Sequence, residues 1–226
     1  MKDPDPAEDL FDPLRLYEIL YAHYGPSGWW PGETPFEIAV GAILTQNTAW
    51  TNVEKAIINL RVKDALTPDV LCRLDMDELA LLLKPSGYYN IKARRLKNLI
   101  EKVLDTDSGG FDAFLSQDLN DLRHSLLDVN GIGKETADSI CCYAAGKTVF
   151  VIDAYTRRVL TRHGYIDSIA DYDSMQALFH SRLPNDLQIY KDLHAYFVFV
   201  GKDYCRSRNP RCDTCPLKGW GRLSIQ

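Results

Sequence analysis

Two short segments of this 226-residue chain carry residue types from which a catalytic site could be built. The first is the turn at residues 130–133, where two glycines flank Ile132 between two helical patterns. Glycine permits positive φ, so the chain can turn sharply here, and amides exposed at such a turn can bind one phosphate. The second is Asp153, which follows the apolar run 149–152 and precedes another helical pattern. A plain turn between helices and an N-terminal helix cap are the structural alternatives.

Apolar residues recur at helical spacing through nearly the whole chain, which predicts an all-α fold. Thr34 followed by Pro35 is typical of a helix start. The only strand-like run precedes Asp153. The expected helices are 10–24, 36–44, 53–60, 75–83, 92–104, one or two in 111–127, 134–145, 154–160, 175–183 and 187–200.

The composition, with 46% hydrophobic and 25% charged residues, is that of an ordinary soluble globular protein. No apolar run is long enough to span a membrane, and the acidic, proline-rich start is not a secretory signal, so we expect a cytoplasmic monomer. The net charge of −5 argues against nucleic-acid binding through bulk charge. Three local basic clusters could override it: Lys92, Arg94, Arg95 and Lys97; Arg157, Arg158 and Arg162; and Lys202, Arg206, Arg208 and Arg211.

A glycine hairpin followed about twenty residues later by a lone Asp resembles the endonuclease III superfamily of base-excision DNA glycosylases. The resemblance runs from about Phe36 to Cys215. It implies two helical domains, 33–147 and 1–32 plus 148–226, with a cleft for damaged double-stranded DNA between them. A non-catalytic helix-hairpin-helix DNA-binding module is the non-enzymatic alternative.

The resemblance also assigns roles to individual residues. Asp153 would be catalytic, stabilising the oxocarbenium-like sugar and orienting or deprotonating water. Gln46 would fill the gap left by an extruded base, although a polar loop between helices is the simpler interpretation. The implied DNA-binding residues are Gln46, Asn130, Gly131, Ile132, Gly133, Lys134 and Thr136.

The residue before Thr136 distinguishes two reaction types. Family members that also cleave the strand carry a lysine there, whose amine forms a Schiff base with the sugar. This chain has Glu135, and Lys134 lies about 100° around the helix. A carboxylate cannot form the imine, so we expect hydrolytic base removal without AP-lyase activity.

The segments 29–31, 85–90 and 133–138, together with Trp50, resemble the 3-methyladenine glycosylase branch of the superfamily. This resemblance implies a base pocket formed by Trp30, Pro31 and Trp50. An N-alkylated purine is cationic, and the face of a tryptophan attracts a cation. Packing anchors are the structural alternative for these tryptophans. The alternative substrates are oxidised pyrimidines, removed by an endonuclease III-like glycosylase with lyase activity, and mismatched bases.

Cys205, Cys212 and Cys215 match three positions of the family's C-x6-C-x2-C-x5-C iron–sulfur pattern, and the fourth falls on Gly221. We expect a [4Fe–4S] cluster with an unusual or solvent fourth ligand. A zinc site would also be short of ligands. A degenerate loop without metal is the structural alternative.

Overall fold

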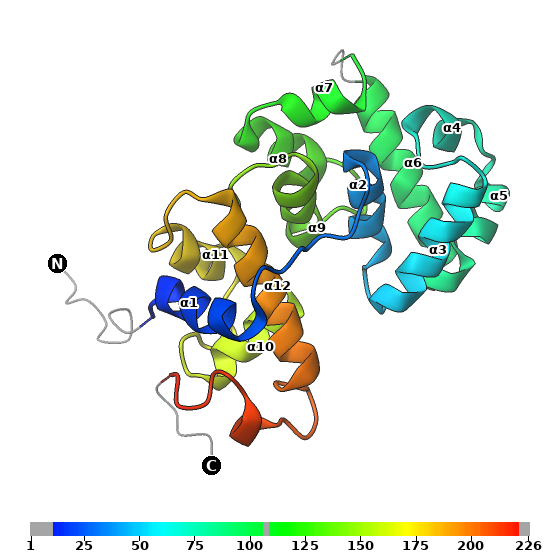
Figure 1. Ribbon diagram of the computed structural model, residues 1–226. Coiled ribbons are helices and arrows are strands. Elements are labelled where there is room, and N and C mark those ends of the chain that lie inside the picture. The colour runs from blue at the N-terminus through cyan, green and yellow to red at the C-terminus, as the bar shows by residue number, and fades with distance from the viewer. Residues whose placement is uncertain (1–10, 106–108, 222–226) are drawn as a thin grey trace. The chain divides into compact units, whose positions relative to one another are not determined.

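The computed structural model describes residues 11–105 and 109–221, and these residues form helices joined by turns and loops, with no strand among them (Figure 1). The predicted all-α class is therefore confirmed. None of the described helices is both long enough and apolar enough to cross a membrane.

The chain forms two compact units. One is the continuous segment Trp30–Lys147, and the other combines Met1–Trp29 with Thr148–Gln226. The division inferred from the family resemblance has its first boundary at residue 33, three residues later than the structure places it.

In the unit Trp30–Lys147, the apolar helix α2 (Pro35–Leu44) forms the centre of the core. Its N-terminal cap is Thr34, whose hydroxyl accepts from the Glu37 amide, and Pro35 opens the helix as expected. Eight of its ten residues are buried, and it packs against α3, α6, α9 and η3. The helices of this unit are α2, α3 (Trp50–Val62), α4 (Pro68–Arg73), α5 (Met76–Leu82), η2 (Lys84–Ser86), α6 (Tyr89–Asp105), α7 (Phe111–Ser116), α8 (Leu119–Leu127), α9 (Lys134–Ser139) and η3 (Ile140–Ala144).

In the other unit, α12 (Leu187–Asp203) is the central element and packs against α1 and α10. Ten of its 17 residues are buried. The core beside it contains the stacked rings of Phe150 and Phe179, whose centroids are 3.8 Å apart. The remaining helices of this unit are α1 (Pro13–Tyr24), α10 (Ala154–Arg162), α11 (Tyr172–His180) and the short η4 (Cys212–Thr214).

Several helix ends lie up to three residues from the expected positions, as in α11, which is Tyr172–His180 rather than 175–183, and two larger differences stand out. The helix α4, capped by Thr67, was not anticipated because six residues are too few to show a clear period. The helix expected over 134–145 changes at Ile140 into a π-helical turn, in which the Ala145 amide donates to the Ile140 carbonyl. Gly146, with φ +65°, follows this helix as predicted.

Candidate functional site

Two glycines shape the hairpin between α8 and α9, one with positive φ and one with open space beside its Cα. Gly131 has φ +97°, and a Cβ there would lie 2.4 Å from the Arg95 side chain, so only glycine fits. Gly133 has an ordinary extended backbone, and a Cβ there would meet nothing within 4 Å, so the space beside its Cα is open. Ile132 is buried, and the Asn130 carbonyl accepts from the Asn98 side chain.

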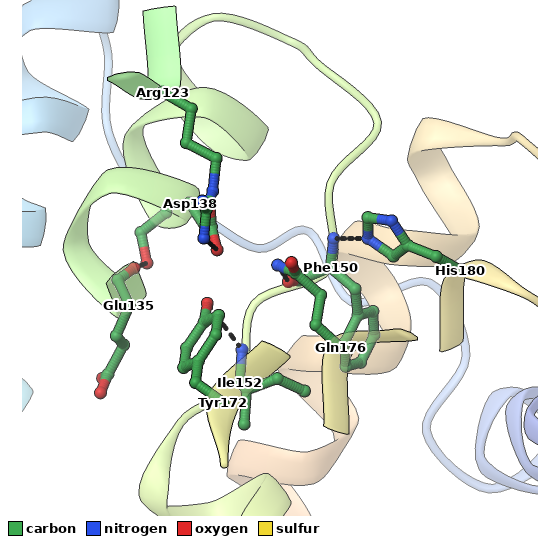
Figure 2. Close-up of polar contacts among 9 residues, drawn as sticks. Arg123, Glu135, Asp138, Phe150, Ile152, Tyr172, Gln176 and His180 are labelled. Carbon is green, nitrogen blue, oxygen red and sulfur yellow. Dashed lines mark hydrogen bonds and ion pairs between the residues drawn. The ribbon is translucent and has the colours of Figure 1, made fainter. Parts of the chain in front are cut away.

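A buried ion pair ties the two hairpin helices together. The guanidinium of Arg123 on α8 donates to both carboxylate oxygens of Asp138 on α9, at 2.6 and 3.2 Å (Figure 2). Asp138 is fully buried, so this contact fixes the orientation of α9. Lys134 and Glu135 are exposed on the first turn of α9, and the Glu135 carboxylate points away from this pair in Figure 2.

Gln46 lies against the hairpin. Its side-chain amide donates to the Gly131 carbonyl at 3.1 Å and to the Thr136 hydroxyl at 2.9 Å, while Arg95 donates to its oxygen. The structure thus brings together Gln46 and the hairpin residues that the sequence singled out.

Lys92 is an internal anchor for the loop that carries Gln46. Its ammonium is buried and donates to the Leu44 carbonyl, the Thr48 hydroxyl and the Ser86 carbonyl at 2.6 to 2.8 Å. Burial, with the neighbouring Arg95 charge, lowers the pKa of Lys92 to about 8.

The basic cluster expected around Lys92 is therefore not a continuous solvent-facing patch. Lys97 likewise donates to three backbone carbonyls, those of Leu71, Cys72 and Leu74. These two lysines satisfy internal acceptors, which the pattern of charge along the sequence does not reveal.

Asp153 caps α10 and uses its two carboxylate oxygens separately. Oδ1 accepts from the Thr156 amide at 2.7 Å, and Oδ2 lies 3.6 Å from Nε2 of His194 on α12. Burial alone would raise the pKa of Asp153, but the contact with His194 and the hydrogen bonds from Thr156 hold it below its ordinary value. The result is a buried carboxylate that stays charged.

The extended run before Asp153 is held by side chains of α11 rather than by a strand partner. The Phe150 amide donates to His180 Nε2 at 3.0 Å, and Gln176 donates to the Phe150 carbonyl at 2.7 Å (Figure 2). The Ile152 amide donates to the Tyr172 hydroxyl at 3.3 Å. Sequence reasoning missed these three side chains and His194, because their partners lie 20 to 41 residues away and no local spacing signals such contacts.

Trp30, Pro31 and Trp50 line a pocket of about 520 Å³ within the unit Trp30–Lys147. The rings of Trp30 and Trp50 meet edge to face, with centroids 5.4 Å apart and an interplanar angle of 89°. Gly41 lies under Trp30, whose indole nitrogen would be 3.2 Å from a Cβ at that position. The predicted pocket residues are therefore neighbours around one cavity.

The carboxylates in the pocket wall have two kinds of partner, an indole N–H and a guanidinium. Glu54 accepts a hydrogen bond from the Trp50 indole N–H at 2.7 Å. Glu33 and Glu37 both pair with Arg61, at 3.2 and 2.9 Å. Glu54 thus adds negative charge at the edge of an aromatic ring, whereas the single positive charge of Arg61 offsets one of the two charges of Glu33 and Glu37.

The three loop cysteines follow α12, and arginines of α10 hold their loop. Arg158 donates to the Cys205 carbonyl at 2.6 Å, and Arg162 approaches the Cys205 sulfur at 3.4 Å. Burial, with the nearby sulfurs of Cys205 and Cys212, raises the pKa of Cys215. Within the described residues, no three His, Cys, Asp or Glu side chains converge on a point that could hold one metal ion.

Two family models match different parts of the chain. A family model described as HhH-GPD superfamily base excision DNA repair protein matches residues 40–185. A second model, the iron-sulfur binding domain of endonuclease III, matches residues 205–220. With the three cysteines, this match supports a [4Fe–4S] cluster.

Relatives and solved structures agree with these matches. A Methanocaldococcus jannaschii protein that carries the provisional name DNA repair glycosylase is 46% identical, over 93% of this chain and 96% of its own. Endonuclease III of Sulfolobus acidocaldarius is 28% identical over 82% of this chain and 80% of its own. The Helicobacter pylori 3-methyladenine DNA glycosylase bound to 1,N6-ethenoadenine is 32% identical, with a TM-score of 0.75, over 85% of this chain and 98% of its own.

Proposed function

Because the chain belongs to the HhH-GPD superfamily of base excision DNA repair proteins, we propose a specific activity within that family. The protein is a DNA glycosylase that flips an alkylated purine of the 3-methyladenine type out of duplex DNA and removes it by hydrolysis, without cleaving the strand. The observation that carries this proposal is the pocket of Trp30 and Trp50 with the Glu54 carboxylate at its wall. The similarity to the 3-methyladenine glycosylase of H. pylori supports it.

The pocket suits a flat cation. A Trp face attracts a cation by about 1 to 2 kcal/mol when the pair is desolvated. The Glu54 carboxylate bonded to the Trp50 N–H adds to the negative potential at that ring. An N-alkylated purine is such a cation, whereas an oxidised pyrimidine is neutral.

The charge of the base also simplifies the chemistry required of the protein. A cationic purine is already a good leaving group, so no residue has to protonate it. The remaining requirement is a group that stabilises positive charge on the sugar and positions water. Asp153, kept ionised by His194 and the Thr156 amide, meets that requirement.

Glu135 supports hydrolysis rather than strand cleavage. It occupies the place where strand-cleaving members of the superfamily carry an amine, and its carboxylate cannot form a Schiff base. Lys134 is exposed on the same turn but is rotated about 100° from it.

The hairpin and Gln46 supply the contacts to DNA in this proposal. The first amides of α9 have no acceptor within the helix and suit one backbone phosphate, which the open side of Gly133 lets approach. Gln46, adjacent to the hairpin, would take the place of the extruded base.

The deciding experiment measures base release from duplex DNA treated with a methylating agent, alongside duplexes containing an oxidised pyrimidine or a mismatch. We expect release of the methylated purine and no borohydride-trapped adduct with abasic DNA. Release of oxidised pyrimidine together with a trapped adduct would establish the endonuclease III-like activity instead. DNA binding without release of any base would reduce the protein to a binding module.

A further inference from the structure

The fourth cysteine of the family's iron–sulfur pattern would stand at position 221, and atoms of His163 occupy the space that its side chain would need. The residue there is Gly221, with φ +108°, a conformation that side-chain-bearing residues rarely adopt. A Cβ at this position would lie 2.9 Å from the His163 carbonyl oxygen and 3.0 Å from its Nδ1. Because one of these atoms belongs to the backbone, a rotamer change could not make room.

His163 is fixed by its own contacts. It follows α10, is 7% exposed, and its Nδ1 hydrogen bonds to the Trp220 carbonyl. The Trp220 ring packs against the His163 ring at 5.1 Å and against the Tyr165 ring at 4.4 Å. The corner beside Gly221 is therefore closed by packed, hydrogen-bonded atoms.

Three further cysteines lie outside the loop. The chain has six cysteines, and Cys72, Cys141 and Cys142 all belong to the unit Trp30–Lys147. Cys141 and Cys142 are buried in its core, and burial raises the pKa of Cys141 to about 12. Cys72 is exposed, and its own substitution tests it directly.

We infer that this chain holds its cluster through three thiolates, those of Cys205, Cys212 and Cys215, and that the fourth iron carries a small exchangeable ligand such as water or hydroxide. Iron–sulfur cubanes are ordinarily held by four thiolates. Three of them are available here, in a loop held by Arg158 and Arg162, and Gly221 with His163 excludes the fourth. The fourth iron is thus a coordination site open to small anions and thiols.

A cluster held in this way loses its open iron when an oxidant removes one electron. The change is [4Fe–4S]²⁺ → [3Fe–4S]⁺ + Fe²⁺ + e⁻, and added ferricyanide accepts the electron. The full-length protein, purified without oxygen, is treated with ferricyanide, and its iron content and EPR spectrum are followed. We expect the EPR signal of a three-iron cluster and the loss of one of four irons, both reversed by Fe²⁺ and a reductant. Retention of all four irons without that signal overturns the inference.

Single substitutions identify the ligands. Cys72→Ser and Cys142→Ser should keep the cluster and its oxidation behaviour, whereas Cys212→Ser should lose the cluster. Loss of iron in Cys72→Ser or Cys142→Ser would make that residue a ligand and overturn the three-thiolate assignment. The inference rests on the family membership and not on the proposed substrate. Iron content and EPR do not depend on which base the protein removes, so they test the three-thiolate assignment independently of the proposed function.

Discussion

At the scale of single residues, Asp153 combines a structural role with the charge that the proposed chemistry needs. Its Oδ1 caps α10, and its Oδ2 faces His194. Hydrolysis of the glycosidic bond requires only the charge, whereas the cap requires only an acceptor. An asparagine can therefore separate the two roles, because it caps helices about as well as aspartate.

The variant Asp153→Asn should lose base release by about a hundred- to thousandfold, because electrostatic stabilisation of the transition state disappears with the charge. Duplex affinity should stay within a few-fold, since phosphate contacts set binding. Single-turnover release and a DNA-binding titration measure the two effects. Near-normal turnover would mean that Asp153 serves only as a helix cap.

His194→Gln should move the acid limb of the pH–rate profile to higher pH. His194 contributes to the lowered pKa of Asp153, so its removal raises that pKa, and the carboxylate is protonated at a pH where the wild type is still charged. The loss should fall on kcat rather than KM. The matched control is His124→Gln, an exposed histidine whose removal should leave the profile unchanged. An unshifted limb in His194→Gln would rule out this positioning role.

Glu54→Gln should reduce kcat/KM for a cationic methylated purine by about three- to tenfold, and should spare neutral damaged bases. Glutamine still accepts from the Trp50 indole, so the ring stays in place while the negative charge is lost. Glu18→Gln makes the same charge change at an exposed site on α1 and should have no effect. Equal losses for charged and neutral bases would show that Glu54 supports the pocket sterically rather than electrostatically.

At the scale of elements, sequence reasoning located most helices and the hairpin, because caps, glycines and helical periods are local signals. Thr34 as a cap and Gly146 as a helix end were both predictable in this way. The side chains that hold the candidate site in place were not predictable, because their contacts join residues far apart in the sequence. Lys92 looked like part of a basic surface and is a buried anchor, and nothing near His194 in the sequence marks it as a neighbour of Asp153.

One ion pair, between Arg123 and Asp138, links α8 to α9. Asp138→Asn should destabilise the protein by about 3 kcal/mol, because Arg123 would be left facing a buried group without a compensating charge. Glu18→Gln removes an exposed pair with Arg15 and should cost less than about 1 kcal/mol. Urea unfolding followed by circular dichroism measures both. Equal, small losses would mean that the hairpin helices are held by apolar packing alone.

At the scale of the whole molecule, Lys92 should make stability depend on pH in the alkaline range. Its pKa is about 8 in the folded chain, against an ordinary 10.5. Between those values the unfolded chain binds a proton that the folded chain does not, so the free energy of unfolding rises with pH across this window. Below about pH 8 both states bind the proton, and the cost of burying the charge is fully present.

The difference in unfolding free energy between wild type and Lys92→Met, measured from about pH 7 to 10, isolates this contribution. Tyrosines with raised pKa values, such as Tyr190, act in the opposite direction at high pH, but they are common to both proteins and cancel. We expect the wild type to gain stability relative to the variant as pH rises. A flat difference would show that Lys92 keeps its ordinary pKa in the folded state.

The way in which one unit interrupts the other sets an order of events during synthesis. Trp30–Lys147 is continuous, so the ribosome releases it whole, and it can fold while the rest is still being made. Helix α1 is translated first, but its partner α12 ends only at Asp203, roughly 3 to 11 s after Lys147 at ordinary rates of elongation. A 12-residue helix is marginally stable alone in water. Leu16 and Leu20, which are buried in the folded unit, therefore remain exposed to solvent during that interval. Helix α1 is thus synthesised before the unit Trp30–Lys147, yet it can pack against α12 only after that unit is complete, and until then its apolar side is open to chaperones.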